Sequence, residues 1–219
     1  MNHANFLEWV RGPAFDIALV IFIFGVSLRL LEIFFLGHKP DYAQMRDQGF
    51  SGGFHTVWSR FLPEKESLKH SSVLIISGYL FHIGLFVTFF LFAPHILLLK
   101  HLLGISWPGL HAPLISFITV ITLIAMLVLL IHRINHPVQR LISGTEDYLT
   151  WLVTFLPLLT GYMAFHHMAG PYPFMLALHL LSVEILMVVF PFTKLMHAIT
   201  FVFARWFTGV RAARKGVSI

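Results

Sequence analysis

The sequence predicts an all-α integral membrane protein that crosses the bilayer five times and forms a single domain over residues 1–219. Hydrophobic residues make up 57% of the chain and charged residues only 11%, which excludes an ordinary soluble domain. Five apolar stretches each approach the roughly 20 residues that a helix needs to cross the hydrocarbon. Lys and Arg concentrate in alternate connections between these stretches, a pattern typical of multi-pass membrane proteins.

The predicted spans follow from the positions of the apolar stretches. The first begins at Phe15, and the segment before it has neither the early basic region nor the small-residue cleavage site of a signal peptide. This span is therefore expected to be retained. The predicted spans cover residues 15–36, 73–99, 114–132, 148–165 and 174–203.

Basic residues in the connections predict the orientation. The inner loop at 37–71 carries five Lys or Arg, starting at Lys39, and the tail at 204–219 carries four. The 133–147 connection adds Arg133 and Arg140, whereas the opposite connections carry only Lys100. The N-terminus is therefore expected outside and the C-terminus in the cytoplasm. Because the basic residues flank spans, the net charge of +5 is explained without a nucleic-acid partner.

The inner loop contains a short segment with an aromatic face. Gly52 and Gly53 predict a break, and the residues after them place Phe54, Trp58 and Phe61, together with Val57, on one face of a helix. Such a helix fits the lipid surface of the membrane. Docking of a cytoplasmic partner is the alternative, and the two are compatible.

The chain contains no cysteine. This excludes disulfides, covalently attached c-type haem and any iron–sulfur cluster held by cysteines of this chain. If electrons are to reach such a cluster, another subunit must carry it.

Four histidines lie in the second and fifth predicted spans, where an imidazole needs a polar partner. His179 and His197 are 18 residues apart, so on one helix they face the same way about 27 Å apart. Haem iron held between helices fits this pattern. His82 is followed by Gly84, which leaves room for a planar group. His95 lies some 140° around the helix from His82, so the bend at Pro94 must turn it toward the fifth helix.

Other polar residues near the spans have both functional and ordinary readings. Lone membrane histidines often only bond a neighbouring helix, and residues at helix ends often only anchor the interface. Three cations near inner helix ends are candidates to bind haem propionates, namely Arg29, Arg133 and Lys194. Three residues toward the outer side are candidates to handle quinol protons, namely Lys100, His101 and His111.

Four segments together resemble the gamma subunit, a membrane cytochrome b, of respiratory nitrate reductase and its relatives. They read GVSLR at 25–29, FHIG at 81–84, HPVQRLISGTEDYL at 136–149 and HLLSVEILMVVFPFTKLMH at 179–197. The resemblance implies a prokaryotic cytoplasmic membrane protein with two b-type haems between its second and fifth helices. It implies that His82 and His197 bind the inner haem and that His179 binds the outer one.

The chain departs from this family at the remaining outer ligand. Where the family has a histidine, this sequence has Leu91, Phe92 and Ala93, and His95 is the nearest substitute. A form with one haem therefore stays open. The long 37–71 loop is similar to the branch found in sulfur-metabolism complexes, where the partner is a heterodisulfide-reductase-like iron–sulfur subunit.

The resemblance implies the quinol-oxidising or quinone-reducing subunit of an oxidoreductase complex, passing electrons between membrane quinone and a cytoplasmic iron–sulfur partner. The alternatives are a haem-free membrane anchor and a histidine-lined proton or solute transporter. The spans show no inverted repeat of the kind that many transporters have.

Overall fold

The computed structural model describes residues 3–35, 46 and 49–217. All regular structure in these ranges is helical, and five helices are long and apolar enough to cross a membrane. The predicted all-α fold with five helices of membrane-spanning length and apolarity is thereby confirmed. Leu36, the expected end of the first span, and Lys39 of the basic loop lie outside the described residues.

The first span begins earlier than the sequence predicts. It runs without interruption over His3–Phe35, comprising α1 (His3–Trp9), η1 (Val10–Ala14) and α2 (Phe15–Phe35). Pro13 does not end the helix, because η1 is a π turn in which the backbone N–H of Phe15 reaches the carbonyl of Val10. Such wider turns accommodate a disturbed hydrogen-bond ladder inside a helix.

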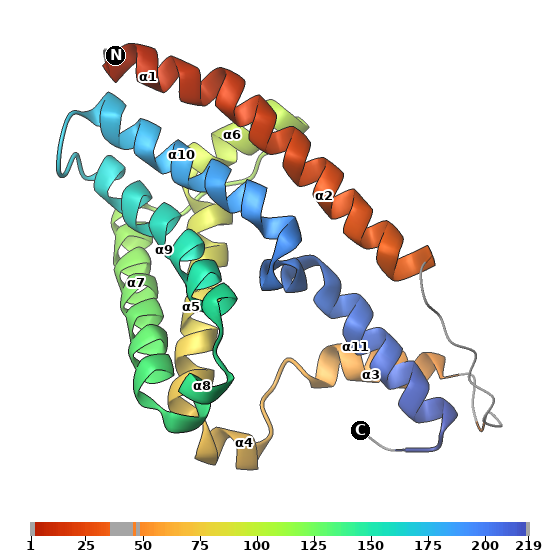
Figure 1. The fold of residues 1–219 in the computed structure, drawn as a ribbon. Helices are drawn as coiled ribbons and strands as arrows, with labels where there is room; N and C mark the ends of the chain where they lie inside the picture. Colours follow the sequence, from red (N-terminus) through yellow and green to blue (C-terminus); the bar gives the residue numbers. More distant parts are fainter. Residues whose placement is uncertain (1–2, 36–45, 47–48, 218–219) are drawn as a thin grey trace.

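The remaining spans form the main body, seen at the left of Figure 1. α5 (Ser72–Leu91) packs along α7 (Ala112–Asn135), and α9 (Thr145–Phe165) packs along α10 (Tyr172–Val189). α10 also lies against α1 and α2, which run alongside it in Figure 1. Buried and half-buried hydroxyls line these contacts, as in the Thr88–Thr119 pair between α5 and α7 and the Thr160–Ser182 pair between α9 and α10.

Two predicted spans are broken in the structure. The second ends at Leu91, after which α6 (Ala93–Leu103) begins with Pro94 in its first turn. The fifth ends at Val189, followed by η2 (Phe190–Phe192), η3 (Lys194–Met196) and α11 (His197–Arg214). Pro191 and Pro94 each lack the N–H that would continue the ladder, and each ring clashes with the preceding turn.

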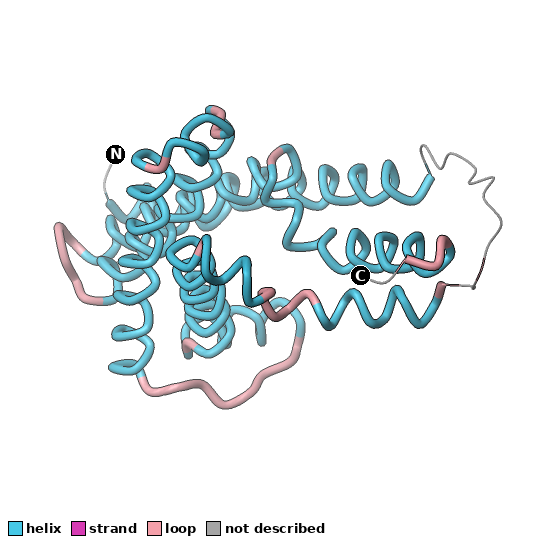
Figure 2. The backbone as a smooth tube through the Cα atoms, turned by 90° about the horizontal axis from the view of Figure 1, so that it is seen from below, coloured by secondary structure: helices cyan, strands magenta, loops and turns pink. Residues whose placement is uncertain are grey.

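A second, smaller unit of structure projects from the body. α3 (Phe50–Ser59) lies across α11, and the two extend together to one side of the molecule (Figures 1 and 2). Two short helices complete the described structure, α4 (Lys65–His70) and α8 (Pro137–Ile142). The helix predicted in the inner loop is confirmed, but Gly52 and Gly53 lie inside α3 and do not break it.

Candidate functional site

The structure brings His82 and His197 together. His82 lies on α5, and His197 is the first residue of α11. Their ring centres are 6.1 Å apart and their planes meet at 78°. The Nδ1 of His82 lies 2.7 Å from the carbonyl oxygen of Gly78, and the Nδ1 of His197 lies 2.7 Å from that of Lys194. We call these two residues the inner pair.

The structure also brings His95 and His179 together, which we call the outer pair. Their ring centres are 6.2 Å apart, with planes at 24°. The Nδ1 of His95 lies 3.0 Å from the carbonyl oxygen of Thr88, and the Nδ1 of His179 lies 3.4 Å from the hydroxyl of Thr160. All four candidate ligands thus use Nδ1 for contacts within the protein and keep Nε2 for another partner.

The pair spacing fits a metal between two imidazoles. An imidazole nitrogen binds a transition metal at about 2.1 Å, so two rings on opposite sides of one metal have centres about 6.4 Å apart. Metal-binding histidines usually donate their second ring N–H to a carbonyl or similar acceptor, which fixes ring orientation. Both pairs meet these conditions, and neither has a third protein ligand. The described residues contain no group of three or more His, Asp or Glu side chains that could hold a metal ion.

A haem fits this donor set because its porphyrin supplies the remaining ligands. α5 packs on α7 and α10 packs on α9, whereas α5 and α11, and likewise α6 and α10, do not pack closely on each other in the described structure. The two histidines of each pair therefore approach each other from helices that are not in close backbone contact.

The break after Leu91 positions His95. The last carbonyls of α5 have no intrahelical partner, as at any helix end. Trp107 Nε1 binds the carbonyl of Phe90 at 2.6 Å, and the backbone N–H of Leu110 binds that of Leu91 at 2.8 Å. The Nδ1 of His95 contacts a third carbonyl near this helix end, that of Thr88. The expectation that Pro94 redirects His95 toward His179 is consistent with this geometry, although the redirection is a helix break and not a bend.

His179 and His197 do not lie on one helix, so the prediction that they share one helical face was wrong. Pro191 ends the first helix, and Thr193 is fully extended before α11 begins. The 18-residue spacing therefore does not correspond to a straight 27 Å rise. Each histidine reaches its partner from its own helix.

Glycines act differently from the sequence expectation. Gly84 does not make room for a planar group, because a Cβ there would collide with Thr122 of α7. It permits the close α5–α7 contact. Gly161 on α9 is the glycine that makes room for a candidate ligand, since its missing side chain leaves space for the His179 ring. Neither Gly161 nor Thr160 was identified from the sequence, and their positions facing His179 depend on how α9 packs.

The three candidate propionate partners all form polar contacts within the protein. The Nε of Arg29 donates to the carbonyl of Pro191 at 3.2 Å, and its guanidinium pairs with Glu32 at 2.8 Å. Lys194 and Arg133 both approach Asp147, at 2.8 Å and 3.5 Å. Asp147 was not identified from the sequence, although it lies in the segment HPVQRLISGTEDYL at 136–149.

The three candidates for quinol protons are all exposed and follow His95 along the chain. Lys100 and His101 lie on α6, which also carries His95, and His111 precedes the first turn of α7. Nearby, His166 lies 3.0 Å from the hydroxyl of Ser116, and His167 and Ala169 adopt positive φ angles of 53° and 63°. Left-handed backbone at non-glycine residues costs energy, so the α9–α10 turn is strained.

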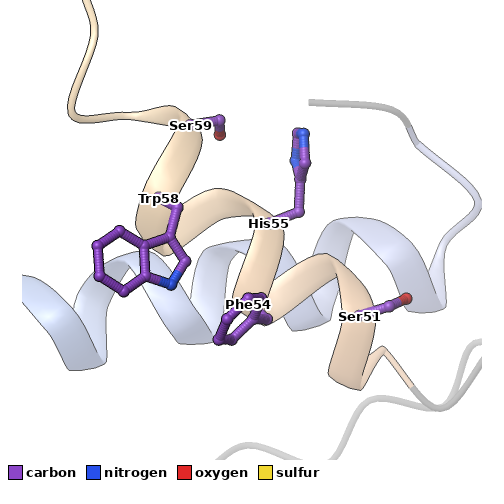
Figure 3. Close-up of a pocket in the computed structure, with 5 residues that line it drawn as sticks. All are labelled: Ser51, Phe54, His55, Trp58 and Ser59. Atoms are coloured by element: carbon purple, nitrogen blue, oxygen red, sulfur yellow. The ribbon is translucent and has the colours of Figure 1, made fainter.

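A second candidate site lies on the α3–α11 unit. A hollow of about 540 Å³ is lined by exposed residues of α3 (Figure 3). Phe54, Trp58 and Phe61 form a continuous aromatic row, as predicted, with neighbouring ring centres 6.2 and 5.8 Å apart. On the opposite side of α3, Gly52 and Gly53 lie directly against α11. The lining residues are Ser51, Phe54, His55, Trp58 and Ser59.

Comparison with known proteins gives one distant similarity. The chain is 26% identical over 216 residues to a protein of Nitratidesulfovibrio vulgaris described only as "Protein", covering 94% of this chain and 93% of the relative. No family model matches the chain, and no solved structure matches it. The similarity extends over nearly the full length of both proteins and names no activity.

Proposed function

We propose that this chain is a b-type cytochrome subunit that passes electrons between membrane quinone and a cytoplasmic iron–sulfur partner. The observation that supports the proposal most is the presence of two histidine pairs with matched spacing, 6.1 and 6.2 Å between ring centres. The Nδ1 atoms of all four rings are held by the protein, which prepares Nε2 for a metal. A haem bound at each pair would supply one-electron transfer across the membrane.

The protein's own residues would set the position and orientation of these groups. Gly78 and Lys194 hold the inner pair through backbone carbonyls, while Thr88 and Thr160 hold the outer pair. At the inner end, Arg133 and Lys194 offer cationic donors to propionates, with Asp147 keeping them in place.

We infer that the N-terminus lies outside and the C-terminus in the cytoplasm of a prokaryotic inner membrane. Support comes from Arg60, which directly follows α3, and from Arg205 and Arg211 of α11, which packs on α3. With this orientation, quinone would bind near the outer pair, and Lys100, His101 and His111 would receive its protons.

The partner is proposed to be an iron–sulfur subunit, such as a heterodisulfide-reductase-like protein, because this chain has no cysteine to hold a cluster. The α3–α11 unit is the surface available to it on the cytoplasmic side. The aromatic row of α3 also fits the membrane surface, so the row can anchor in lipid while other faces meet the partner.

The test is the haem content of the purified chain. An absorbance spectrum of the dithionite-reduced protein should show a b-type α band, and extraction of haem should give two per chain. One haem per chain would reject the outer site while leaving a cytochrome. Absence of haem from folded protein would favour a haem-free anchor or a transporter.

A further inference from the structure

Glu184 is a buried acid that the proposed function does not use. It lies on α10, is only 4% exposed, and neither carboxylate oxygen has a hydrogen-bond partner among the described residues. It follows His179 by five residues, a rise of about 7.5 Å along the helix. Ionisable residues inside membrane spans are rare, and burying an acid without a partner lowers the stability of the fold. Such a residue is therefore a candidate for a functional role.

Helical register places Glu184 on the face of α10 that packs against α2. The two helices run in the same direction, since His3 contacts Phe174 near one end and Gly25 meets Pro191 near the other (Figure 1). Ala18 lies seven residues before Gly25, and Glu184 lies seven residues before Pro191. Because the two helices rise equally per residue, Ala18 and Glu184 are expected at about the same level. Ala18 is 2% exposed and offers no hydrogen bond. The residue of α2 at the level of Glu184 is therefore apolar and gives the carboxyl no side-chain partner.

No charged group of the neighbouring elements pairs with Glu184. Arg29 is engaged by Pro191 and Glu32, and Asp147 at the start of α9 is engaged by Lys194. Glu184 forms no ion pair among the described residues. The other titratable groups on the elements packed against α10 are His3, Glu8, Arg11, Asp16, Glu146, Tyr148 and Tyr162, and those on α10 itself are Tyr172 and His179.

We propose that Glu184 is a proton-binding site coupled to the redox state of the outer pair. The inference rests on the proposed function, because it needs a haem at His95 and His179. A haem at the outer pair would carry one more positive charge when oxidised than when reduced, and this charge would favour the carboxylate form of Glu184 across the low-dielectric interior. When a quinol delivers one electron, that extra charge would be lost, and the carboxylate of Glu184 would take up one proton from water. One electron and one proton enter together, so the buried charge is balanced.

The experiment compares Glu184→Gln with Glu66→Gln in the purified haem-containing protein. Glutamine keeps the size of the side chain and cannot bind this proton, and Glu66 is an exposed acid on α4. The first measurement is the midpoint potential of the outer haem from pH 5 to pH 9. The second is the redox-difference infrared spectrum, in which a protonated carboxyl gives a distinct C=O band that shifts in D₂O.

Unaltered protein and Glu66→Gln should both show a potential that falls with pH and a carboxyl band that appears on reduction. Glu184→Gln should lose both signals. Retention of both signals in Glu184→Gln would overturn the assignment. If Glu184→Gln does not fold, the unaltered protein still decides: absence of a redox-linked carboxyl band from it rejects the proposal. Two haems with a pH-independent outer potential reject this inference alone, whereas absence of haem rejects the proposed function as well.

Discussion

Substitution of Gly161 by alanine gives the sharpest test of the outer pair. A Cβ at this position would lie 2.9 Å from Cε1 and 3.1 Å from Nδ1 of His179. Ordinary contacts of this kind begin at 3.4 Å, so the imidazole must retreat by about 0.5 Å. The contact of its Nδ1 with Thr160 is already 3.4 Å long and would be lost.

The expected loss follows from the role of such supporting contacts. Removing the group that orients a metal-binding histidine typically lowers metal affinity 10–100-fold, which corresponds to about 1.4–2.8 kcal/mol. Gly161→Ala should therefore release the outer haem during purification in detergent while the inner haem stays. Alanine favours a helix interior by about 1 kcal/mol over glycine, so weakened helix formation cannot explain the loss.

The assay is haem per chain together with the reduced absorbance spectrum. Gly12→Ala is the matched control, because a Cβ at Gly12 meets nothing within 4 Å. The control should keep two haems, and Gly161→Ala should keep one. If Gly161→Ala retains two haems with unaltered spectra, His179 is not held as the structure indicates, and its assignment as a ligand would have to be abandoned.

Four further predictions address the pairs and the topology. His95→Ala and His179→Ala should each lose the same haem, as extraction would show; loss in only one variant would reveal a different partner. Electron paramagnetic resonance of the oxidised protein should give two low-spin signals, a strongly axial one from the pair with planes at 78° and a rhombic one from the pair at 24°, and two identical signals would contradict these angles. Asp147→Asn removes the ion pair with Lys194 and should shift the potential of the inner haem only, as redox titration would show. A periplasm-active reporter fused after Ile219 should be inactive, and its activity would reverse the proposed orientation.

The sequence was sufficient for the spans because hydrophobic length alone defines them. It was less informative about where helices stop. Pro13 and Pro94 are similar as sequence features, yet a π turn absorbs the first and the second starts a new helix. The difference depends on partners far along the chain, since Trp107 and Leu110 satisfy the carbonyls that the second break exposes.

The four candidate ligands were identified from the sequence, although part of the supporting geometry was wrong. The inference used one long helix for His179 and His197, whereas Pro191 separates them. Residues that hold the ligands were missed because their role depends on packing between helices. Gly161 and Thr160 contact His179 only once α9 lies beside α10, and no sequence spacing records that contact.

The joint before α11 has a mechanical consequence. Thr193 is the extended residue about which α11 would turn, His197 lies four residues beyond it, and Gly209, which rests on α3, lies sixteen beyond. These positions correspond to lever arms of about 6 and 24 Å. If α11 rotated about Thr193, the displacement of His197 would be about one quarter of the displacement of Gly209. A shift of about 2 Å at Gly209 would move His197 by about 0.5 Å, near the tolerance of a well-held site. Movement of the α3–α11 unit, for example on binding a partner, would therefore leave His197 almost in place.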